Sequence, residues 1–490
     1  MVLAGSRTLH AVPPHRTRNA GGYVQVPIPV WGIVFLVALL TALPSQDPFL
    51  TFACISVAPF LATLVWREDE PPVAFAALMA QWLQISVGTL RATANGVDLN
   101  TLFHTGGASY ANWLSLGGLL TLALGIRAAN FNRAQMNIGA LHAELNSFRY
   151  SRVVAAYCIA QAANIFSQGL IWIVPGLTQA LLAATNLRWL FYFILTVTTL
   201  VQKRGYGYLA AATLFEVIFG LASFFSDFKT VFFVFAVSYL MVQRRINVWM
   251  VMSLAVLFGV LFYMAIIWSA VKMDYRSYQN QGTGAQTSMV GTVDKLERLI
   301  ELVRNVDEQR FWFGFDALTE RIEYTRFFGY VTENVPSFLP YDDGGIWGAA
   351  IYHVITPRLL FPDKGDITAD IQNTVHYTGL AFAGGGNDTE IPLGYMAESY
   401  IDFGPVGMFV PILLLGLLVG FEYRYFATRR FSLVFAYGLL PVVFATVISY
   451  EETAIKILGG NLIVFIVSYL ACKFAVPLLQ PWLTGIRRRA

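Results

Sequence analysis

The sequence predicts an all-α integral membrane protein with about twelve transmembrane helices and one large, partly helical loop outside the cytoplasm. Of the 490 residues, 56% are hydrophobic and only 13% are charged, whereas soluble domains carry about a quarter charged residues. Apolar runs of the roughly 20 residues that a helix needs to cross a bilayer follow one another almost from end to end. A single long polar interval interrupts them, and it predicts the loop.

The apolar runs divide the chain into five parts. A polar N-terminal tail (1–27) precedes about nine helices in 28–271, the polar interval covers 272–402, about three helices fill 403–479, and a basic tail (480–490) ends the chain. The twelve expected spans lie near residues 28–44, 49–66, 72–90, 109–127, 153–174, 178–201, 206–226, 229–242, 247–271, 404–421, 431–449 and 455–478.

The orientation follows from Lys and Arg in the short loops, which are retained on the cytoplasmic side. If the N-terminus is cytoplasmic, basic clusters fall on that side at almost every second loop, for example at Lys203 and Arg204. Both termini are then cytoplasmic and the interval 272–402 lies outside. Arg91 and Lys229 are the exceptions, because this topology places them at the outer face.

Three helices are expected in the loop. Residues 294–306 carry apolar side chains at the spacing of one helical face, a second helix is expected to begin after Asp316 as N-cap, and the apolar stretch GGIWGAAIYHVI is expected to lie on the membrane surface and to stop before Pro357. Acidic residues outnumber basic ones in the loop by about two to one, which argues against a nucleic-acid partner. The cysteines Cys54, Cys158 and Cys472 lie in apolar runs, and we expect no disulfide.

The basic residues of the outer face are candidates for binding phosphate groups. In the stretch TPRLLFPDKGD, two prolines restrict the backbone around Arg358 and Lys364. Arg326 and Lys229 are further candidates, because Arg binds phosphate oxygens with two hydrogen bonds and an ammonium at the membrane boundary can meet a lipid phosphate. Ion pairs are the alternative reading of each, with Asp227 in the case of Lys229 and with the acidic residues of the loop for the others.

His353 and Glu398 are the candidates for acid–base chemistry in the loop. A histidine titrates near neutral pH, and either residue can accept the proton of a sugar hydroxyl; an anchoring role at the membrane interface is the alternative for both. The sequence does not rank one above the other. Glu216 is a further carboxylate inside an apolar run, where it indicates function or a helix contact.

Aromatic residues are frequent in the loop, and their faces pack well against sugar rings. The candidates for a sugar site are Trp347, Tyr352, Tyr395 and Tyr400. Packing against lipid or the protein core is the alternative for each of them. No cluster of His, Cys or Asp at metal-ligand spacing and no cofactor motif occurs in the sequence, so we expect neither a metal nor a cofactor.

In its overall pattern the chain resembles the Wzy-type polymerases of O-antigen and exopolysaccharide repeat units. The resemblance rests on a many-span chain with one long loop in its C-terminal half, on the segment ITPRLLFPDK, and on the segment GYMAESYIDFGPVG before the next span. The turn before the eighth span departs from the family pattern, since it reads Ser226-Asp227-Phe228-Lys229 where the family has a Gly-Ser-Arg or Ser-Lys type motif.

The resemblance implies an integral-membrane glycosyltransferase of the GT-C type in the bacterial inner membrane, with its loop in the periplasm. Such an enzyme transfers the growing glycan from undecaprenyl pyrophosphate to the non-reducing end of a new lipid-linked repeat unit. The implied partners are these lipid-linked oligosaccharides, membrane lipids, a chain-length regulator and a flippase. Three alternatives stay open: an O-antigen ligase that transfers glycan to lipid A core, a polysaccharide transporter or flippase, and a membrane scaffold without catalytic activity.

Overall fold

The computed structural model describes residues 22–171, 178–222, 229–242, 248–283, 289–356, 361, 370–380, 391–428 and 432–485. Within these ranges the secondary structure is helical and contains no strand, apart from an isolated bridge between Tyr23 and Arg67. The all-α prediction is therefore confirmed for the part of the chain that the structure describes.

The helices fall into three groups along the chain. The first group precedes the loop and consists of α1 (Ile28–Ala42), α2 (Pro48–Val65), α3 (Val73–Ala94), α4 (Leu99–Phe103), α5 (Ala108–Ala129), α6 (Ile138–Ser147), α7 (Tyr150–Ile171), α8 (Thr178–Asn186), α9 (Arg188–Gln202), α10 (Tyr206–Ala222), α11 (Lys229–Val242) and α12 (Val248–Gln279). The second group is α13 (Thr292–Arg304), α14 (Glu308–Ile322), α15 (Thr325–Asn334), α16 (Gly345–Ile355) and α17 (Asp370–Thr378). The third group is α18 (Tyr395–Gly407), α19 (Phe409–Thr428), α20 (Leu433–Phe444), α21 (Ala454–Leu470) and α22 (Val476–Thr484), with a π-helical turn at Ala471–Ala475 between the last two.

Seven helical segments of the described chain are long and apolar enough to cross a membrane. They are Pro48–Val65, Val73–Ala94, Ala108–Ala129, Tyr150–Leu170, Thr178–Gln202, Phe409–Thr428 and Ala454–Thr484. Each of the twelve expected ranges overlaps a helix, but α1, α10, α11 and α20 are shorter than a span needs. The number of twelve spans therefore stays a prediction.

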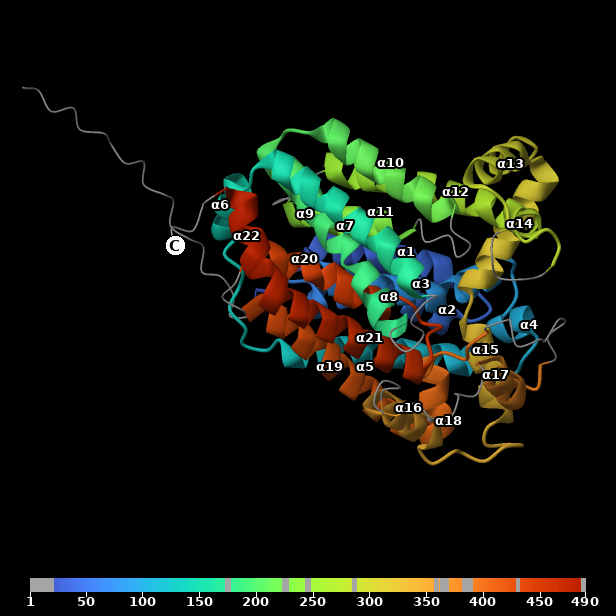
Figure 1. Ribbon diagram of the computed structural model, residues 1–490. Helices are drawn as coiled ribbons and strands as arrows, with labels where there is room; N and C mark the ends of the chain where they lie inside the picture. The colour runs from blue at the N-terminus through green and yellow to red at the C-terminus, as the bar shows by residue number, and fades with distance from the viewer. Residues whose placement is uncertain are drawn as a thin grey trace, which may run out of the picture.

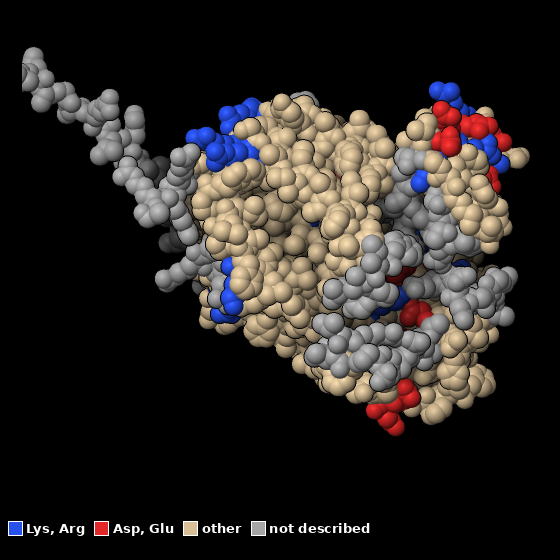
Figure 2. All heavy atoms as spheres, viewed as in Figure 1, with Lys and Arg blue, Asp and Glu red and all other residues tan. Residues whose placement is uncertain are grey.

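The long helices run in roughly a common direction, and the two ends of the molecule differ (Figure 1). Helices α6 and α22 lie at one end, which we call the basic end. Helices α4 and α13 to α17 lie at the other, which we call the loop end. On the face drawn in Figure 2, Lys and Arg atoms gather at the basic end, whereas the loop end carries both basic and acidic atoms.

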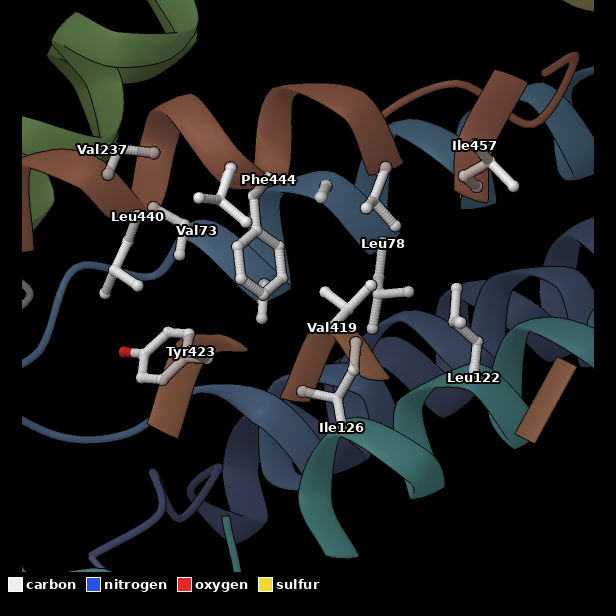
Figure 3. Close-up of a cluster of buried hydrophobic side chains, with 14 of the residues drawn as sticks. Val73, Leu78, Leu122, Ile126, Val237, Val419, Tyr423, Leu440, Phe444 and Ile457 are labelled. Carbon is white, nitrogen blue, oxygen red and sulfur yellow. The ribbon is translucent and has the colours of Figure 1, made fainter. Parts of the chain in front are cut away.

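The core is formed by apolar side chains from helices that are far apart in the sequence. Figure 3 shows Leu78 of α3, Ile126 of α5, Val419 of α19 and Phe444 of α20 turned toward one another, and all four are buried. Tyr423 lies at the margin of this cluster with its hydroxyl directed away from it. That hydroxyl donates to Glu70 Oε2 at 2.8 Å.

Glycines allow α5 and α19 to approach closely. A Cβ atom at Gly416 would lie 2.5 Å from the backbone oxygen of Leu122, and one at Gly125 would lie 2.7 Å from the backbone oxygen of Leu413. Gly420 is in the same position against Ile126. The sequence Gly416-Leu-Leu-Val-Gly420 is therefore a small-residue motif of the kind that joins membrane helices.

Two of the three helices expected in the loop are present with nearly the expected bounds, namely α13 and α16. The expectation that Asp316 caps the second helix is wrong. Helix α14 begins at Glu308 and its N-cap is Asp307, which accepts a hydrogen bond from the backbone N–H of Arg310 at 2.8 Å. Asp316 therefore lies inside α14, and a separate helix, α15, follows from Thr325.

Candidate functional site

The candidate site lies at the loop end, where α18 meets the first turn of α21. Helices α16 and α18 pack against α21, and α17 packs against α15; all five lie in the same region of Figure 1. The segment GYMAESYIDFG, on which the family resemblance rested, forms most of α18.

A tight backbone contact holds the start of α18. Gly394 has a φ of +91°, and a Cβ atom there would lie 2.8 Å from the backbone oxygen of Tyr450. Any other residue would be strained in this conformation and would collide with the chain. Next to it, the backbone N–H of Tyr395 donates to the oxygen of Glu452 at 2.7 Å. These contacts fix α18 against the segment that leads into α21.

Glu398 is the buried carboxyl of the site. Its side chain is 2% exposed, and Oε2 accepts a hydrogen bond from the backbone N–H of Ala454, the first residue of α21, at 2.6 Å. Burial raises the pKa of Glu398 to about 8, and the nearby Asp370 and Asp402 act in the same direction, whereas the Ala454 bond and Lys456 oppose it. Near neutral pH this carboxyl can therefore both give and take a proton.

An ion pair lies close to this carboxyl. Lys456 Nζ, in the first turn of α21, is 2.7 Å from Asp370 Oδ2 at the start of α17. Our sequence reasoning missed both residues. The available signal was a lysine just inside an apolar run, in EETAIKILGG, where a cation requires a partner or a function.

Asp402 has a structural role that the sequence analysis did not predict. Its carboxylate accepts hydrogen bonds from the backbone N–H groups of Ile346 at 3.1 Å and Trp347 at 2.8 Å. These are N–H groups of the first turn of α16, which no side chain of its own N-cap satisfies. Asp402 of α18 thus caps α16. Burial raises the pKa of this carboxyl, while the two N–H groups act against the shift.

The four aromatic candidates occupy different environments. Trp347 is buried and its indole N–H donates to Ser399 Oγ at 3.0 Å. Tyr395 and Tyr400 are also buried, with hydroxyls that donate to Gln81 Oε1 at 2.9 Å and to the backbone oxygen of Val335 at 3.0 Å. Tyr352 on α16 is 62% exposed. Of the four, Tyr352 presents its ring at the surface.

The two other described candidates lie around the same helices. His353 is half-buried in the last turn of α16, which packs along α21. Arg326 of α15 is half-buried, with its guanidinium 5.1 Å from the ring centre of Phe327. Burial is the main cause that raises the pKa of the nearby Tyr324 hydroxyl. The carboxyls of Asp370, Glu451 and Glu452 raise this pKa further, whereas Arg326 lowers it.

Three of the predicted cations cannot be placed. Arg358 and Lys364 lie outside the described residues. Lys229 is the first residue of α11, but its side chain also lies outside the described part.

Arg91 of α3, the other exception to the retention of basic residues on the cytoplasmic side, forms an ion pair. Its Nη1 lies 3.1 Å from both carboxylate oxygens of Glu323, so a loop carboxylate neutralises it.

The arrangement combines a proton-carrying carboxyl, a lysine and an arginine in one region. In Figure 2, basic and acidic atoms lie next to each other near the loop end of the molecule. Within the described ranges, no three His, Cys, Asp or Glu side chains converge as metal ligands would. Chemically, the raised pKa of Glu398 suits a proton transfer, and Lys456 is paired with Asp370 beside it.

Comparison with known families gives one match. A family model described as "Domain of unknown function (DUF8712)" matches residues 138–425, which is more than half of the chain. The chain belongs to the DUF8712 family. Neither the curated proteins nor the solved structures contain a match. The DUF8712 match runs from α6 to α19, so it contains Glu398 and Asp370 but ends before α21, which supplies Ala454 and Lys456.

Proposed function

We propose that this protein is a polysaccharide polymerase of the bacterial inner membrane, which transfers a growing glycan from undecaprenyl pyrophosphate to the non-reducing end of a lipid-linked repeat unit. The observation that supports it most is the position of Glu398. A buried carboxyl with a pKa near neutrality stands at the N-terminus of a membrane-length helix, with Lys456 and Asp370 paired nearby. Lipid-linked substrates would reach such a place from the bilayer.

The chemistry of the transfer requires two kinds of groups. The bond between the anomeric carbon and the pyrophosphate oxygen breaks, a new bond forms to the acceptor hydroxyl oxygen, and the hydroxyl proton moves to a base. In this proposal Glu398 or His353 takes that proton. Negative charge grows on the departing pyrophosphate, and Lys456, Arg326 and Arg358 are the cations assigned to it, with Lys364 and Lys229 in support.

The charge distribution supports an orientation with the basic end in the cytoplasm. Arg149 and Lys203 belong to connections at that end and Arg152 lies in the first turn of α7; such residues are retained on the cytoplasmic side. The loop end would then lie in the periplasm, where the lipid-linked repeat units of this proposal are joined without a nucleotide sugar.

An O-antigen ligase is the nearest alternative, because it would act on the same lipid pyrophosphate and need the same groups. A transporter is a more distant one, and a buried carboxyl beside a lysine would fit a substrate site there too. The glycan made in cells separates these functions. A strain that lacks a polymerase carries single repeat units, a strain that lacks a ligase accumulates polymer on the lipid carrier, and a strain that lacks the transporter holds its lipid-linked repeat units on the cytoplasmic side.

The cellular test therefore compares glycan length in a deletion strain complemented with the wild type or with Arg358→Ala. We expect single repeat units in the deletion strain, full-length polymer with the wild type, and a loss of long polymer with Arg358→Ala at equal membrane abundance. Long polymer in the deletion strain would refute the polymerase proposal. Long polymer with the variant would refute only the role of Arg358.

A further inference from the structure

A line of polar side chains runs along one face of α7. Tyr157, Gln161, Asn164 and Gln168 follow one another at intervals of four, three and four residues, the spacing of a single helical face. All four lie inside the candidate span Tyr150–Leu170. The opposite face is apolar and exposed at Ile159 and Phe166, as expected of a lipid-facing surface.

The polar face meets two charged residues of neighbouring helices. Helices α7 and α9 pack together, and α10 lies beside them in Figure 1. Tyr157 donates to Glu216 Oε1 of α10 at 3.0 Å, and Gln161 Nε2 donates to the same oxygen. Arg188 Nε of α9 lies 3.9 Å from Glu216 Oε2 and forms an ion pair with this carboxylate.

These groups lie deep in the expected membrane region. Glu216 follows the first residue of α10, Tyr206, by ten positions, which corresponds to about 15 Å of helix, or about half of a bilayer core. Glu216 is 2% exposed, Gln161 6% and Asn164 2%. A carboxylate, a guanidinium and two amides are thus buried together where the bilayer itself supplies no hydrogen bonds.

Two atoms of the two amides have no hydrogen-bond partner among the described residues. They are Gln161 Oε1 and Asn164 Nδ2. The other amide atoms are engaged, since Gln161 Nε2 binds Glu216 and Asn164 Oδ1 accepts from Gln168 Nε2 at 3.2 Å. Buried polar groups in native proteins are nearly always bonded to protein or to ordered water. A donor and an acceptor one helical turn apart are the arrangement that a water molecule satisfies.

We propose that the face formed by Tyr157, Gln161, Asn164 and Gln168, which we call the α7 seam, holds buried water molecules that connect Glu216 with the loop end. The direction follows from the order of the side chains. Gln161, Asn164 and Gln168 continue from Glu216 toward the loop end, whereas the buried neighbours of Tyr157 toward the basic end are the apolar Val153 and Ala156. Water, and with it protons, would reach a carboxylate halfway through the membrane from one side.

The test measures how fast thiols along α7 react with N-ethylmaleimide in native membranes, because the thiolate that reacts forms only in contact with water. Gln161→Cys, Asn164→Cys and Gln168→Cys probe the α7 seam. Ile159→Cys and Phe166→Cys are matched controls at similar depths on the lipid-facing side. The parent is Cys158→Ser, since Cys158 is exposed on α7, whereas Cys54 and Cys472 are buried.

We expect the seam positions to react at least about tenfold faster than the lipid-facing controls. A charged methanethiosulfonate reagent does not cross membranes and can be added from the periplasmic side before N-ethylmaleimide. It should protect the thiol of Gln168→Cys from N-ethylmaleimide best and that of Gln161→Cys least. Equal rates on the two faces of α7 would show that the α7 seam is dry and would overturn the proposal. Faster protection of Gln161→Cys than of Gln168→Cys would overturn the assigned direction.

A variant that fails to fold would expose both faces and is recognised by reaction at Cys54 and Cys472, which stay unreactive in a folded protein. The wild type supplies a control that needs no substitution. Its Cys158 directly follows Tyr157 but lies on the exposed side, so we expect it to react as slowly as the lipid-facing controls. Rapid reaction of Cys158 in the wild type would also contradict the proposal.

Discussion

Glu398 affects both the stability of the protein and its proposed acid–base chemistry. Its carboxyl is enclosed by protein and accepts only one described hydrogen bond, from Ala454. Enclosure favours the neutral form, so the folded protein holds a proton that the unfolded chain releases near pH 4.5. The same property that makes Glu398 a candidate acid–base group therefore links the folding of the protein to pH.

The stability of the protein should fall as pH rises between about 4.5 and about 8. In this window the folded state binds one proton more than the unfolded state. The free energy of unfolding therefore falls by on the order of 1 kcal/mol for each pH unit. It stops falling above the pKa of Glu398 in the folded state. Glu398→Gln keeps an oxygen for the Ala454 N–H and removes the titration. Thermal unfolding in detergent at about pH 5 and about pH 8 measures the difference. An equal pH dependence in wild type and variant would contradict the assignment.

At the scale of single elements, α16 depends on a cap that comes from another helix. Its own N-cap is Gly344, which offers no side chain, and Asp402 accepts from two N–H groups of its first turn. Sequence patterns identify caps that are close along the chain. Asp402 lies far from α16 in sequence, so no local signal could reveal this role.

Asp402→Ala should destabilise the protein by about 1 to 2 kcal/mol, because two buried N–H groups lose their acceptor. Faster amide hydrogen exchange in α16, with unchanged exchange in α5, would be the specific sign. Glu320→Ala, which removes an exposed carboxylate of α14 that lies outside α16, is the control. Unchanged protection of α16 in Asp402→Ala would show that the cap is dispensable.

The contact between α5 and α19 makes a second prediction at this scale. Gly416→Ala should destabilise the protein by about 1 to 3 kcal/mol, because the new methyl group meets the backbone of α5. Gly460→Ala is the matched control on α21, where a Cβ atom would have nothing within 4 Å. That substitution should be neutral or stabilising, since alanine favours helix more than glycine. Thermal unfolding of the two variants in the same detergent tests the difference in sign.

At the scale of the whole molecule, the sequence predicted the helical class and the positions of most helices, because long apolar runs and amphipathic spacing are local signals. It did not predict that α16 and α18 would pack against α21, since the contacts of α18 join residues more than 50 positions apart and those of α16 join residues about a hundred positions apart. Glu398 was found from its place beside a predicted span. Lys456 and Asp370 were missed because each looked ordinary by itself, and only the fold joins them.

The orientation of the molecule is itself testable. The account places α13 to α17 on the periplasmic side and the connection at Lys203 and Arg204 in the cytoplasm. A membrane-impermeant thiol reagent applied to cells with a permeable outer membrane should label Glu301→Cys on α13, which is exposed, and should leave Lys203→Cys unlabelled until the inner membrane is opened. The reverse pattern would place the candidate site in the cytoplasm and remove the basis of the proposed reaction.

The most direct test of the central claim is transfer by the purified protein in proteoliposomes supplied with undecaprenyl-pyrophosphate-linked repeat units. The account predicts glycans of increasing length on the lipid carrier, at a rate that EDTA does not change. One of the two variants Glu398→Gln and His353→Gln, in its folded state, should lower the rate at least about a hundredfold, the usual scale of losing a general acid or base. Failure of the wild type to lengthen the glycan, or polymerisation at the wild-type rate by both variants, would contradict the account.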